Sequence, residues 1–217
     1  MIAMILAAGR GERLRPLTET IPKALVEVRG RSLLERHLDS LNVAGIETVV
    51  INLGWLGERI AERIGSGHAY GLSVIYSPEG DNILETGGGI RRALPLLGRD
   101  PFLVVNADIY TDMPLRPAEL GESDMAHLVL VPKPSHKEHG DFDLQDGRVC
   151  DSENAAYTFS GVAVYRPEFF ADCEPGRFPL APMLRTAARE GRLAGSLYDG
   201  LWEDVGTPER LAELNRS

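Results

Sequence analysis

The sequence is poor in cysteine and has no long apolar run, and each absence excludes a class of protein. Only two cysteines occur among the 217 residues, Cys150 and Cys173, so neither a disulfide framework nor a cysteine-based metal motif is predicted. No segment approaches the roughly 18 apolar residues that a membrane-spanning helix needs. The apolar run over residues 1–8 precedes its first basic residue, Arg10, whereas a secretory signal begins with positive charge. We therefore expect a protein of the reducing cytoplasm with no membrane partner.

Basic residues are also scarce, but they are concentrated near the N-terminus. The chain holds 23 basic and 32 acidic residues, a net charge of −9, which disfavours nucleic acid as a partner. Between residues 10 and 36, however, seven basic residues occur against four acidic ones. A basic segment on an acidic protein is a candidate anion-binding site, although chance clustering on a solvated surface would give the same count.

Low-complexity segments, internal repeats and linkers are absent, and strand-like and helical patterns alternate through the first half. Strands are predicted at residues 1–7, 48–52, 72–76 and 102–106. Helices are predicted at residues 32–44, 55–64 and 88–97. Ser32 and Glu35 have the spacing of a capping box at the start of the first helix. This alternation indicates βαβ units and a mainly parallel sheet.

The second half has shorter strands separated by polar loops. Strands are predicted at residues 126–131, 142–144, 148–150, 158–165 and 193–198. Helices are predicted at residues 179–190 and from residue 207 through 214. Residues 132–140 are the least regular stretch and are interpreted as a loop. We expect a three-layer, Rossmann-like α/β fold with a mixed, mostly parallel central sheet and a small antiparallel lobe.

A segment of small residues directly follows the first predicted strand. It reads Leu6-Ala7-Ala8-Gly9-Arg10-Gly11-Glu12-Arg13. A dinucleotide fingerprint would have a third glycine where Leu14 stands, and a Walker A loop would continue Gly-Lys-Ser/Thr, so neither motif is present. Small residues let backbone N–H groups approach an anion or a flat base closely. A tight turn without any ligand would explain the two glycines equally well.

Two cations follow this segment in a stretch that is bounded by prolines. Arg13 precedes Pro16, and Lys23 follows Pro22. We expect an ordered loop that returns over the sheet and holds both cations above the strand ends, where ligands of α/β sheets bind. Guanidinium and ammonium groups in that position would suit a polyphosphate.

Two aspartates at strand ends are candidate metal ligands. Asp108 follows the apolar strand at residues 102–106, and Asp204 follows Leu201-Trp202-Glu203. Either could be a solvated turn residue or a helix cap. Together, near a triphosphate site, they would suit Mg²⁺, which prefers one or two carboxylates with phosphate oxygens and water. His136 and His139 with Asp141 could mimic a zinc cluster, but they lack a convincing fourth ligand.

These segments together resemble the signature of sugar-1-phosphate nucleotidylyltransferases. The matching residues are Leu6-Ala7-Ala8-Gly9-x-Gly11-x-Arg13, Pro16-Leu17-Thr18, Pro22-Lys23, Asn106-Ala107-Asp108 and Trp202-x-Asp204-Val205-Gly206-Thr207. The resemblance therefore spans nearly the whole chain. Two positions depart from it, because Ala24 stands where the family has proline and Ala107 where it has glycine. Both replacements are small, so we expect the geometry to be retained, although Ala107 could tighten the approach of a metal.

Further motifs resemble the members of that family that use N-acetylmuramate 1-phosphate in peptidoglycan recycling. They are Pro78-Glu79-Gly80, Glu85-Thr86-Gly87-Gly88-Gly89, Ala93-Leu94-Pro95-Leu96-Leu97-Gly98, Gly140-Asp141-Phe142 and Thr158-Phe159-Ser160-Gly161. The resemblance implies an enzyme that joins UTP to N-acetylmuramate α-1-phosphate and releases pyrophosphate. It implies one domain over residues 1–217, with a nucleotide-binding half (1–112) and a sugar-binding half (113–217), as a monomer or homodimer.

The resemblance also implies a role for individual residues. Arg13 and Lys23 would be catalytic, and Asp108 and Asp204 would bind Mg²⁺. The nucleotide would be bound by Ala7, Ala8, Gly9, Gly11, Glu12, Arg13, Lys23, Glu79, Gly87, Gly88 and Asn106. The sugar would be bound by Gly140, Glu153, Phe159 and Ser160. For Gly87 and Gly88, a helix start that needs close backbone packing is an alternative interpretation.

Three other functions remain compatible with the sequence. A mannose- or glucose-1-phosphate nucleotidylyltransferase that uses GTP or dTTP belongs to the same class. A phosphocholine cytidylyltransferase would need an aromatic cage, for which the sequence has no clear cluster. A non-catalytic nucleotide-sugar sensor is the alternative of another class, and the intact set of Arg13, Lys23, Asp108 and Asp204 argues against it.

Overall fold

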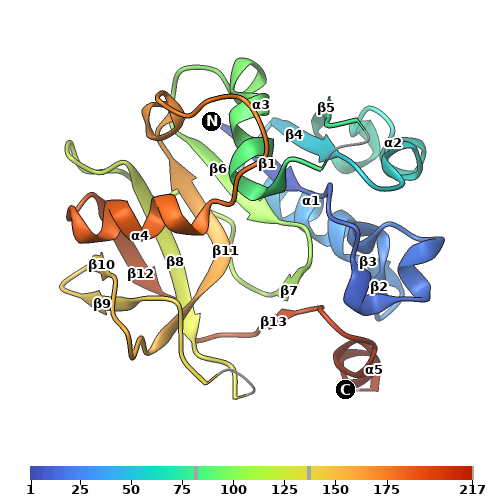
Figure 1. The fold of residues 1–217 in the computed structure, drawn as a ribbon. Coiled ribbons are helices and arrows are strands. Elements are labelled where there is room, and N and C mark those ends of the chain that lie inside the picture. The colour runs from blue at the N-terminus through green and yellow to red at the C-terminus, as the bar shows by residue number, and fades with distance from the viewer. Residues whose placement is uncertain (81–82, 136–137, 217) are drawn as a thin grey trace.

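The computed structural model describes residues 1–80, 83–135 and 138–216. Its main element is a nine-stranded sheet (Figure 1). In spatial order the strands are β5 (Ser73–Pro78), β4 (Thr48–Leu53), β1 (Ile2–Leu6), β6 (Phe102–Asn106), β11 (Tyr157–Tyr165), β8 (Ala126–Pro132), β12 (Leu193–Leu197), β10 (Arg148–Cys150) and β9 (Asp143–Gln145). Strands β11 and β10 run against the other seven, so the sheet is mixed and mostly parallel, as predicted.

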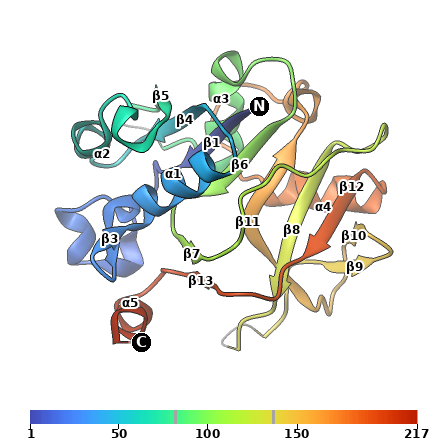
Figure 2. The same ribbon diagram turned by 180° about the vertical axis from the view of Figure 1, so that it is seen from behind.

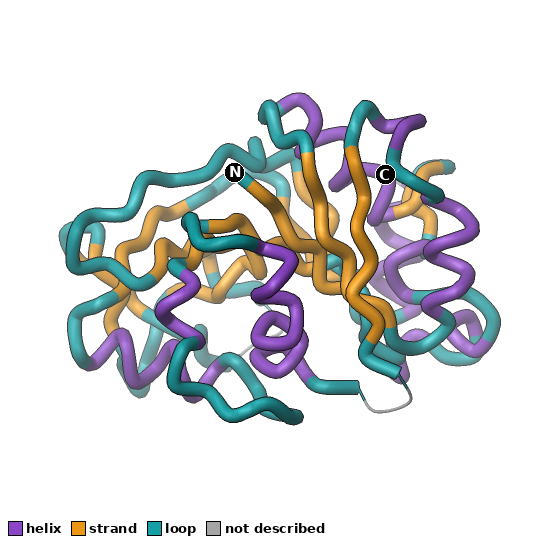
Figure 3. Tube along the Cα trace, turned by 90° about the horizontal axis from the view of Figure 1, so that it is seen from above, coloured by secondary structure: helices purple, strands orange, loops and turns teal. Residues whose placement is uncertain are grey.

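Helices cover both faces of the sheet and make the fold three-layered. Helices α1 (Leu33–Val43) and α2 (Gly57–Ile64) pack on one face, and α3 (Glu85–Leu97) and α4 (Ala181–Arg189) pack on the other. Figure 2 shows α1 on the near side with α4 behind the sheet, and Figure 3 shows the strands between the helices. Helix α5 (Pro208–Arg216) packs instead against the short hairpin of β2 (Glu27–Val28) and β3 (Arg31–Ser32).

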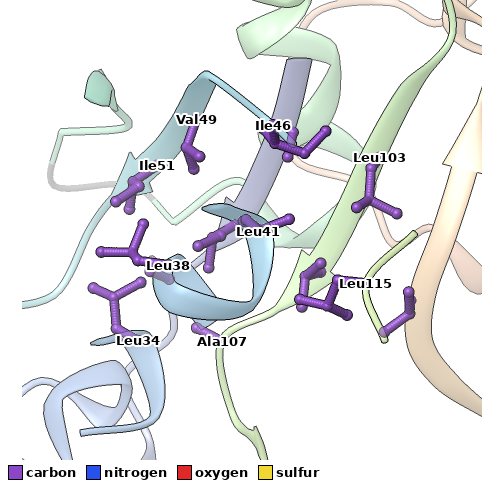
Figure 4. Close-up of a cluster of buried hydrophobic side chains, with 14 of the residues drawn as sticks. Leu34, Leu38, Leu41, Ile46, Val49, Ile51, Leu103, Ala107 and Leu115 are labelled. Carbon is purple, nitrogen blue, oxygen red and sulfur yellow. The ribbon is translucent and has the colours of Figure 1, made fainter. Parts of the chain in front are cut away.

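Alternate residues of β1 enter two separate cores. Ala3 and Ile5 pack on the α1 side, whereas Met4 packs on the other side with Ile90 of α3. Successive side chains of a strand point to opposite faces, so a strand between two helical layers must be apolar on both. Figure 4 labels the α1 side of the core with Leu34, Leu38, Leu41, Ile46, Val49, Ile51, Leu103, Ala107 and Leu115.

The capping box at the start of α1 is confirmed. Ser32 Oγ accepts a hydrogen bond from the Glu35 N–H at 3.2 Å, and Glu35 Oε2 accepts one from the Ser32 N–H, also at 3.2 Å. These bonds satisfy two donors that a helix start leaves unpaired. Gly45, with φ of +80°, follows the helix where the sequence predicts its end.

The largest difference between a predicted and an observed element boundary is at α3, which begins at Glu85 and not at residue 88. Three consecutive glycines have poor helix propensity, so the sequence favours a turn there. The pairing of β7 (Ile109–Thr111) with β13 (Trp202–Asp204) was also missed, because both strands are too short to show a period. Residues 136–137 of the predicted loop, including His136, lie outside the described residues.

Five short 3₁₀ helices are also present in the part of the chain that the structure describes. They are η1 (Glu12–Leu14), η2 (Leu17–Glu19), η3 (Lys23–Leu25), η4 (His68–Tyr70) and η5 (Pro167–Phe170). The first three form the ordered loop that the sequence predicts between Gly11 and the β2 strand. Within the described residues, no helix combines the length and apolar character that crossing a bilayer requires.

Candidate active site

The carboxyl ends of three parallel strands meet at one edge of the sheet. The register pairs Leu6 of β1 with Asn52 of β4 on one side and with Asn106 of β6 on the other. Asn52 accepts a hydrogen bond from the Ala7 N–H at 2.7 Å and donates one to Glu79 Oε1 at 2.6 Å. Both Asn52 and Glu79 are buried, so their polar groups need these partners. The network therefore fixes the backbone that leaves β1.

Two adjoining cavities open at this edge. The smaller, of about 200 Å³, is lined by Leu6, Ala7, Ala8, Gly9, Lys23, Ala24, Asn52, Glu79, Ile83, Glu85, Thr86, Asn106, Ala107 and Asp108. The larger, of about 1030 Å³, is lined by Gly9, Arg10, Gly11, Glu12, Arg13, Lys23, Ile83, Leu84, Asp108, Arg177 and Gly206. Of the eleven residues predicted to bind nucleotide, all but Gly87 and Gly88 therefore line one cavity or both.

The conformation of the glycine-rich segment depends on Gly11. Its φ is +63°, a value that side-chain-bearing residues rarely adopt, and a Cβ there would lie 2.9 Å from Thr18 Cγ2. Thr18 Oγ1 donates a hydrogen bond to the Gly11 carbonyl at 2.8 Å. The Trp55 indole N–H in turn donates to the Thr18 carbonyl at 2.8 Å. The loop is thus held to itself and to the segment after β4, which keeps its position over the strand ends.

Five charged groups from distant parts of the chain converge beside this loop. Lys23 Nζ lies 2.5 Å from Asp108 Oδ2. Asp204 pairs with Arg210 of α5. A Cβ placed on Gly206 would lie 3.1 Å from Asp204 Oδ2 and 3.2 Å from Arg13 Nη2, so both groups border this glycine.

The two aspartates lie at the ends of paired strands, because Asp108 directly precedes β7 and Asp204 is the last residue of β13. The β7–β13 register places Asp204 opposite Ile109, the residue after Asp108, and the Val205 N–H donates to the Asp108 carbonyl at 2.9 Å. Among the described residues, no cluster of three or more histidine, cysteine or acidic side chains could hold a metal. Two carboxylates that rely on phosphate oxygens and water for the remaining ligands match the preference of Mg²⁺.

A buried histidine lies close to Asp108. His37 of α1 is 3% exposed, and its Nε2 has no hydrogen-bond partner. Burial lowers the pKa of His37 to about 4, although the charge of Asp108 and a hydrogen bond with the Ile109 backbone act in the opposite direction. His37 is therefore neutral near pH 7 and carries no positive charge to the site.

Gly87 and Gly88 do not present free N–H groups to the cavities. Both donate to the Phe178 carbonyl at 3.1 Å. A Cβ on Gly87 would lie 2.4 Å from the Phe178 ring, and one on Gly88 would lie 2.2 Å from the Gly176 carbonyl oxygen. This packing supports the alternative interpretation of a helix start that needs close backbone packing, and the nucleotide-binding role of the two glycines stays a prediction.

The predicted sugar-binding residues are not part of the lining of either cavity. Gly140 is packed against Tyr157, whose carbonyl oxygen would lie 2.3 Å from an added Cβ, and Glu153 is exposed in the loop before β11. Phe159 is half-buried against the core. The Ser160 hydroxyl is buried and donates to the Val129 carbonyl at 2.7 Å, and its role as a sugar ligand stays a prediction.

Sequence reasoning missed three polar residues of this region. Asn52 ends an apolar strand in the same way as Asn106 does, a signal that could have identified it. Arg177 lines the larger cavity, and Arg210 holds Asp204, but neither belongs to a local motif. Both arginines reach the site only through tertiary packing.

Comparisons with known proteins show the family and the fold of this chain. A family model described as "Nucleotidyl transferase" matches residues 2–149. The N-acetylmuramate alpha-1-phosphate uridylyltransferase of Neisseria meningitidis is 50% identical over 98% of this chain and 96% of that protein. The protein of the same name in Caulobacter vibrioides is 38% identical over 98% and 97%. A solved structure of UDP-glucose pyrophosphorylase complexed with UDP-glucose shares the fold, with a TM-score of 0.78, 19% identity, and coverage of 99% of this chain and 97% of that one.

Proposed function

Because this chain belongs to the nucleotidyl transferase family, we propose that it joins UTP to N-acetylmuramate α-1-phosphate, giving UDP-N-acetylmuramate and pyrophosphate. The observation that carries the reaction class is the convergence of the glycine-rich loop, Arg13, Lys23 and two aspartates at one edge of the sheet. The substrates follow from the names of relatives that are 50% and 38% identical over almost their whole length.

The nucleophile in this reaction needs no general base. A phosphate monoester has a second pKa of about 6, so a sugar 1-phosphate is largely dianionic near pH 7. One of its oxygens attacks the α-phosphorus of UTP, and the bond to the departing pyrophosphate breaks. The site therefore has to align the two substrates and stabilise the negative charge that develops on the leaving group.

The cations of the loop match that requirement. Arg13 and Lys23 line the larger cavity and would bind the phosphates of the nucleotide. The smaller cavity, with Ala7, Ala8 and Glu79, would hold the nucleoside. Mg²⁺ held by Asp108 and Asp204 would supply further charge neutralisation on the phosphates. Lys23, now paired with Asp108, would then be free to contact phosphate.

The proposed reaction has a place in peptidoglycan recycling, which we infer from the named substrate of the relatives. We also place the enzyme in the cytoplasm. Both cysteines, Cys150 and Cys173, are free thiols in the structure, which suits a reducing compartment.

A matrix of nucleoside triphosphates against sugar 1-phosphates, read out as pyrophosphate release, tests the proposal. UTP with N-acetylmuramate α-1-phosphate should give the highest kcat/KM. A preference for GTP or dTTP with mannose or glucose 1-phosphate would instead assign one of the other activities of the family. Calorimetric binding of UDP-sugars without turnover of any pair would identify a sensor.

A further inference from the structure

Residues 176–178 pack on the start of α3 and bring one arginine to the site. The Phe178 carbonyl accepts hydrogen bonds from both Gly87 and Gly88, and the Phe178 N–H donates to the Leu84 carbonyl at 3.1 Å. The missing Cβ atoms of the two glycines are what allows this approach. The residue after Arg177 is therefore hydrogen-bonded to the start of α3, and the residue before it, Gly176, packs against Gly88.

The Arg177 side chain lines the larger cavity and is oriented by Glu85. Arg177 Nε and Nη2 both lie 2.8 Å from Glu85 Oε1. The Arg177 side chain is 70% exposed, and an ion pair with that exposure contributes little to folding. Glu85 itself has a φ of +61°, a strained conformation of the kind that occurs at ligand-binding positions. The contribution to folding stability alone does not explain the Arg177–Glu85 ion pair, whereas a role in binding a ligand in the cavity does.

The origin of Arg177 in the chain separates it from the other cations of the two cavities. Within the described residues, the cationic side chains that line these cavities are Arg10, Arg13, Lys23 and Arg177. The first three belong to the glycine-rich segment and the loop after it, where the triphosphate is proposed to bind. Arg177 alone comes from the second half of the chain, from a segment that is hydrogen-bonded to Leu84, another residue of the cavity lining.

We propose that Arg177 binds the carboxylate of the sugar substrate and thereby selects N-acetylmuramate 1-phosphate over sugar phosphates without a carboxylate, an inference that rests on the proposed function. The lactyl ether of N-acetylmuramate carries a carboxyl group that is ionised at neutral pH. A guanidinium presents five N–H donors in a planar fork and binds a carboxylate with two parallel hydrogen bonds. The single Glu85 oxygen engages only part of that fork, so donors remain for the substrate.

The test compares two substrates that differ only in the lactyl group. Arg177→Ala should lower kcat/KM for N-acetylmuramate α-1-phosphate by about 10-fold or more, the effect of losing a charge-assisted hydrogen bond. The kcat/KM for N-acetylglucosamine α-1-phosphate should change by less than about 2-fold. Arg177→Lys, which keeps the charge but loses the fork, should fall between the wild type and the alanine variant. Arg192→Ala is the matched control, because Arg192 forms an exposed ion pair with Glu190 and lines neither cavity.

Binding measurements keep the test decisive if the second substrate turns over too slowly. The affinity of each sugar phosphate for the wild type and for Arg177→Ala would then be measured by competition for the site. The ratio of these affinities would replace the ratio of kcat/KM values. An equal loss for both substrates in Arg177→Ala would overturn the inference, because it would assign the arginine to the shared phosphate or to folding. Wild-type enzyme that does not use N-acetylmuramate α-1-phosphate would refute the proposed function itself. Turnover with unchanged selectivity in Arg177→Ala would refute only the role of Arg177.

Discussion

Lys23 and Asp108 neutralise each other at the edge of the sheet, although 85 residues separate them in the chain. Lys23 is 14% exposed, so leaving its ammonium group unpaired would be costly. Asp204 is paired in the same way with Arg210. At the residue scale, each proposed metal ligand thus has a cationic partner, Lys23 for Asp108 and Arg210 for Asp204.

The aspartates provide the prediction at this scale. Asp108→Asn and Asp204→Asn should each lower kcat at least ~100-fold, comparable to the loss of a major electrostatic contact with the transition state. Steady-state kinetics at saturating Mg²⁺ would measure the effect. Rates close to the wild type in either variant would contradict the assignment of that aspartate as a metal ligand.

At the scale of elements, the start of α1 shows how a local motif acquires tertiary partners. Glu35, which completes the capping box, also receives hydrogen bonds from Arg63 of α2 and from Tyr70 at 2.9 Å. Burial alone would raise the pKa of Glu35, but the hydrogen bonds from Ser32, Arg63 and Tyr70 together outweigh burial and lower the pKa to about 2. The ionised form of Glu35 therefore joins α1 to α2 and to the turn before β5.

Glu35→Gln should lose a stabilisation that depends on pH. The folded pKa lies below the ordinary value of 4.5, so the stabilisation is present above pH 4.5 and disappears as the pH falls through about 2. The variant should be less stable than the wild type by up to about 3 kcal/mol at pH 7. Urea unfolding at pH 7, 4 and 3 should show this difference shrinking. Glu62→Gln, on the exposed face of α2, is the control, and a difference that stays constant with pH would contradict the linkage.

The start of α3 gives a prediction in which two effects have opposite signs. Helix propensity alone would make Gly88→Ala stabilising by about 1 kcal/mol. The added Cβ, however, would collide with the Gly176 carbonyl, so we expect a loss of about 1–3 kcal/mol in the free energy of unfolding. Chemical denaturation would measure whether the free energy of unfolding of Gly88→Ala rises or falls. A stabilised variant would show that residues 176–178 are not held against α3.

At the scale of the whole molecule, the site is a junction between segments far apart in the sequence. The loop after β1, the end of β6 and the returning β13 all contribute to it. Residues from both halves of the chain, such as Lys23 and Arg177, line one cavity. A ligand that contacts all these segments should bind the folded chain and not the unfolded one, and should therefore raise the free energy of unfolding.

Thermal unfolding tests this statement. UTP with Mg²⁺ at about 100 times its Kd should stabilise the fold by about 2.7 kcal/mol and raise Tm by about 5 °C or more. The rise should be smaller in Lys23→Ala, because a phosphate contact is lost. A wild-type Tm that does not respond to UTP at millimolar concentration would count against a nucleotide site at this edge.

Features that have a local signal could be predicted from the amino-acid sequence alone. Alternating apolar strands and helices predicted the three-layer sheet, and the capping box predicted the start of α1. The glycine-rich segment, Lys23 and Asp108 were identified because each follows a strand or belongs to a compact motif, and parallel strands bring such ends together.

Which groups face the cavities depends on how distant segments pack together, and no local pattern in the sequence shows it. Gly87 and Gly88 donate hydrogen bonds to the Phe178 carbonyl, and the buried Ser160 hydroxyl donates to the Val129 carbonyl. Arg177 pairs with Glu85, which is 92 residues away in the sequence. Contacts at such separations leave no periodicity and no short motif, because they depend on how finished elements pack. The residue types at the site could therefore be predicted, whereas their partners could not.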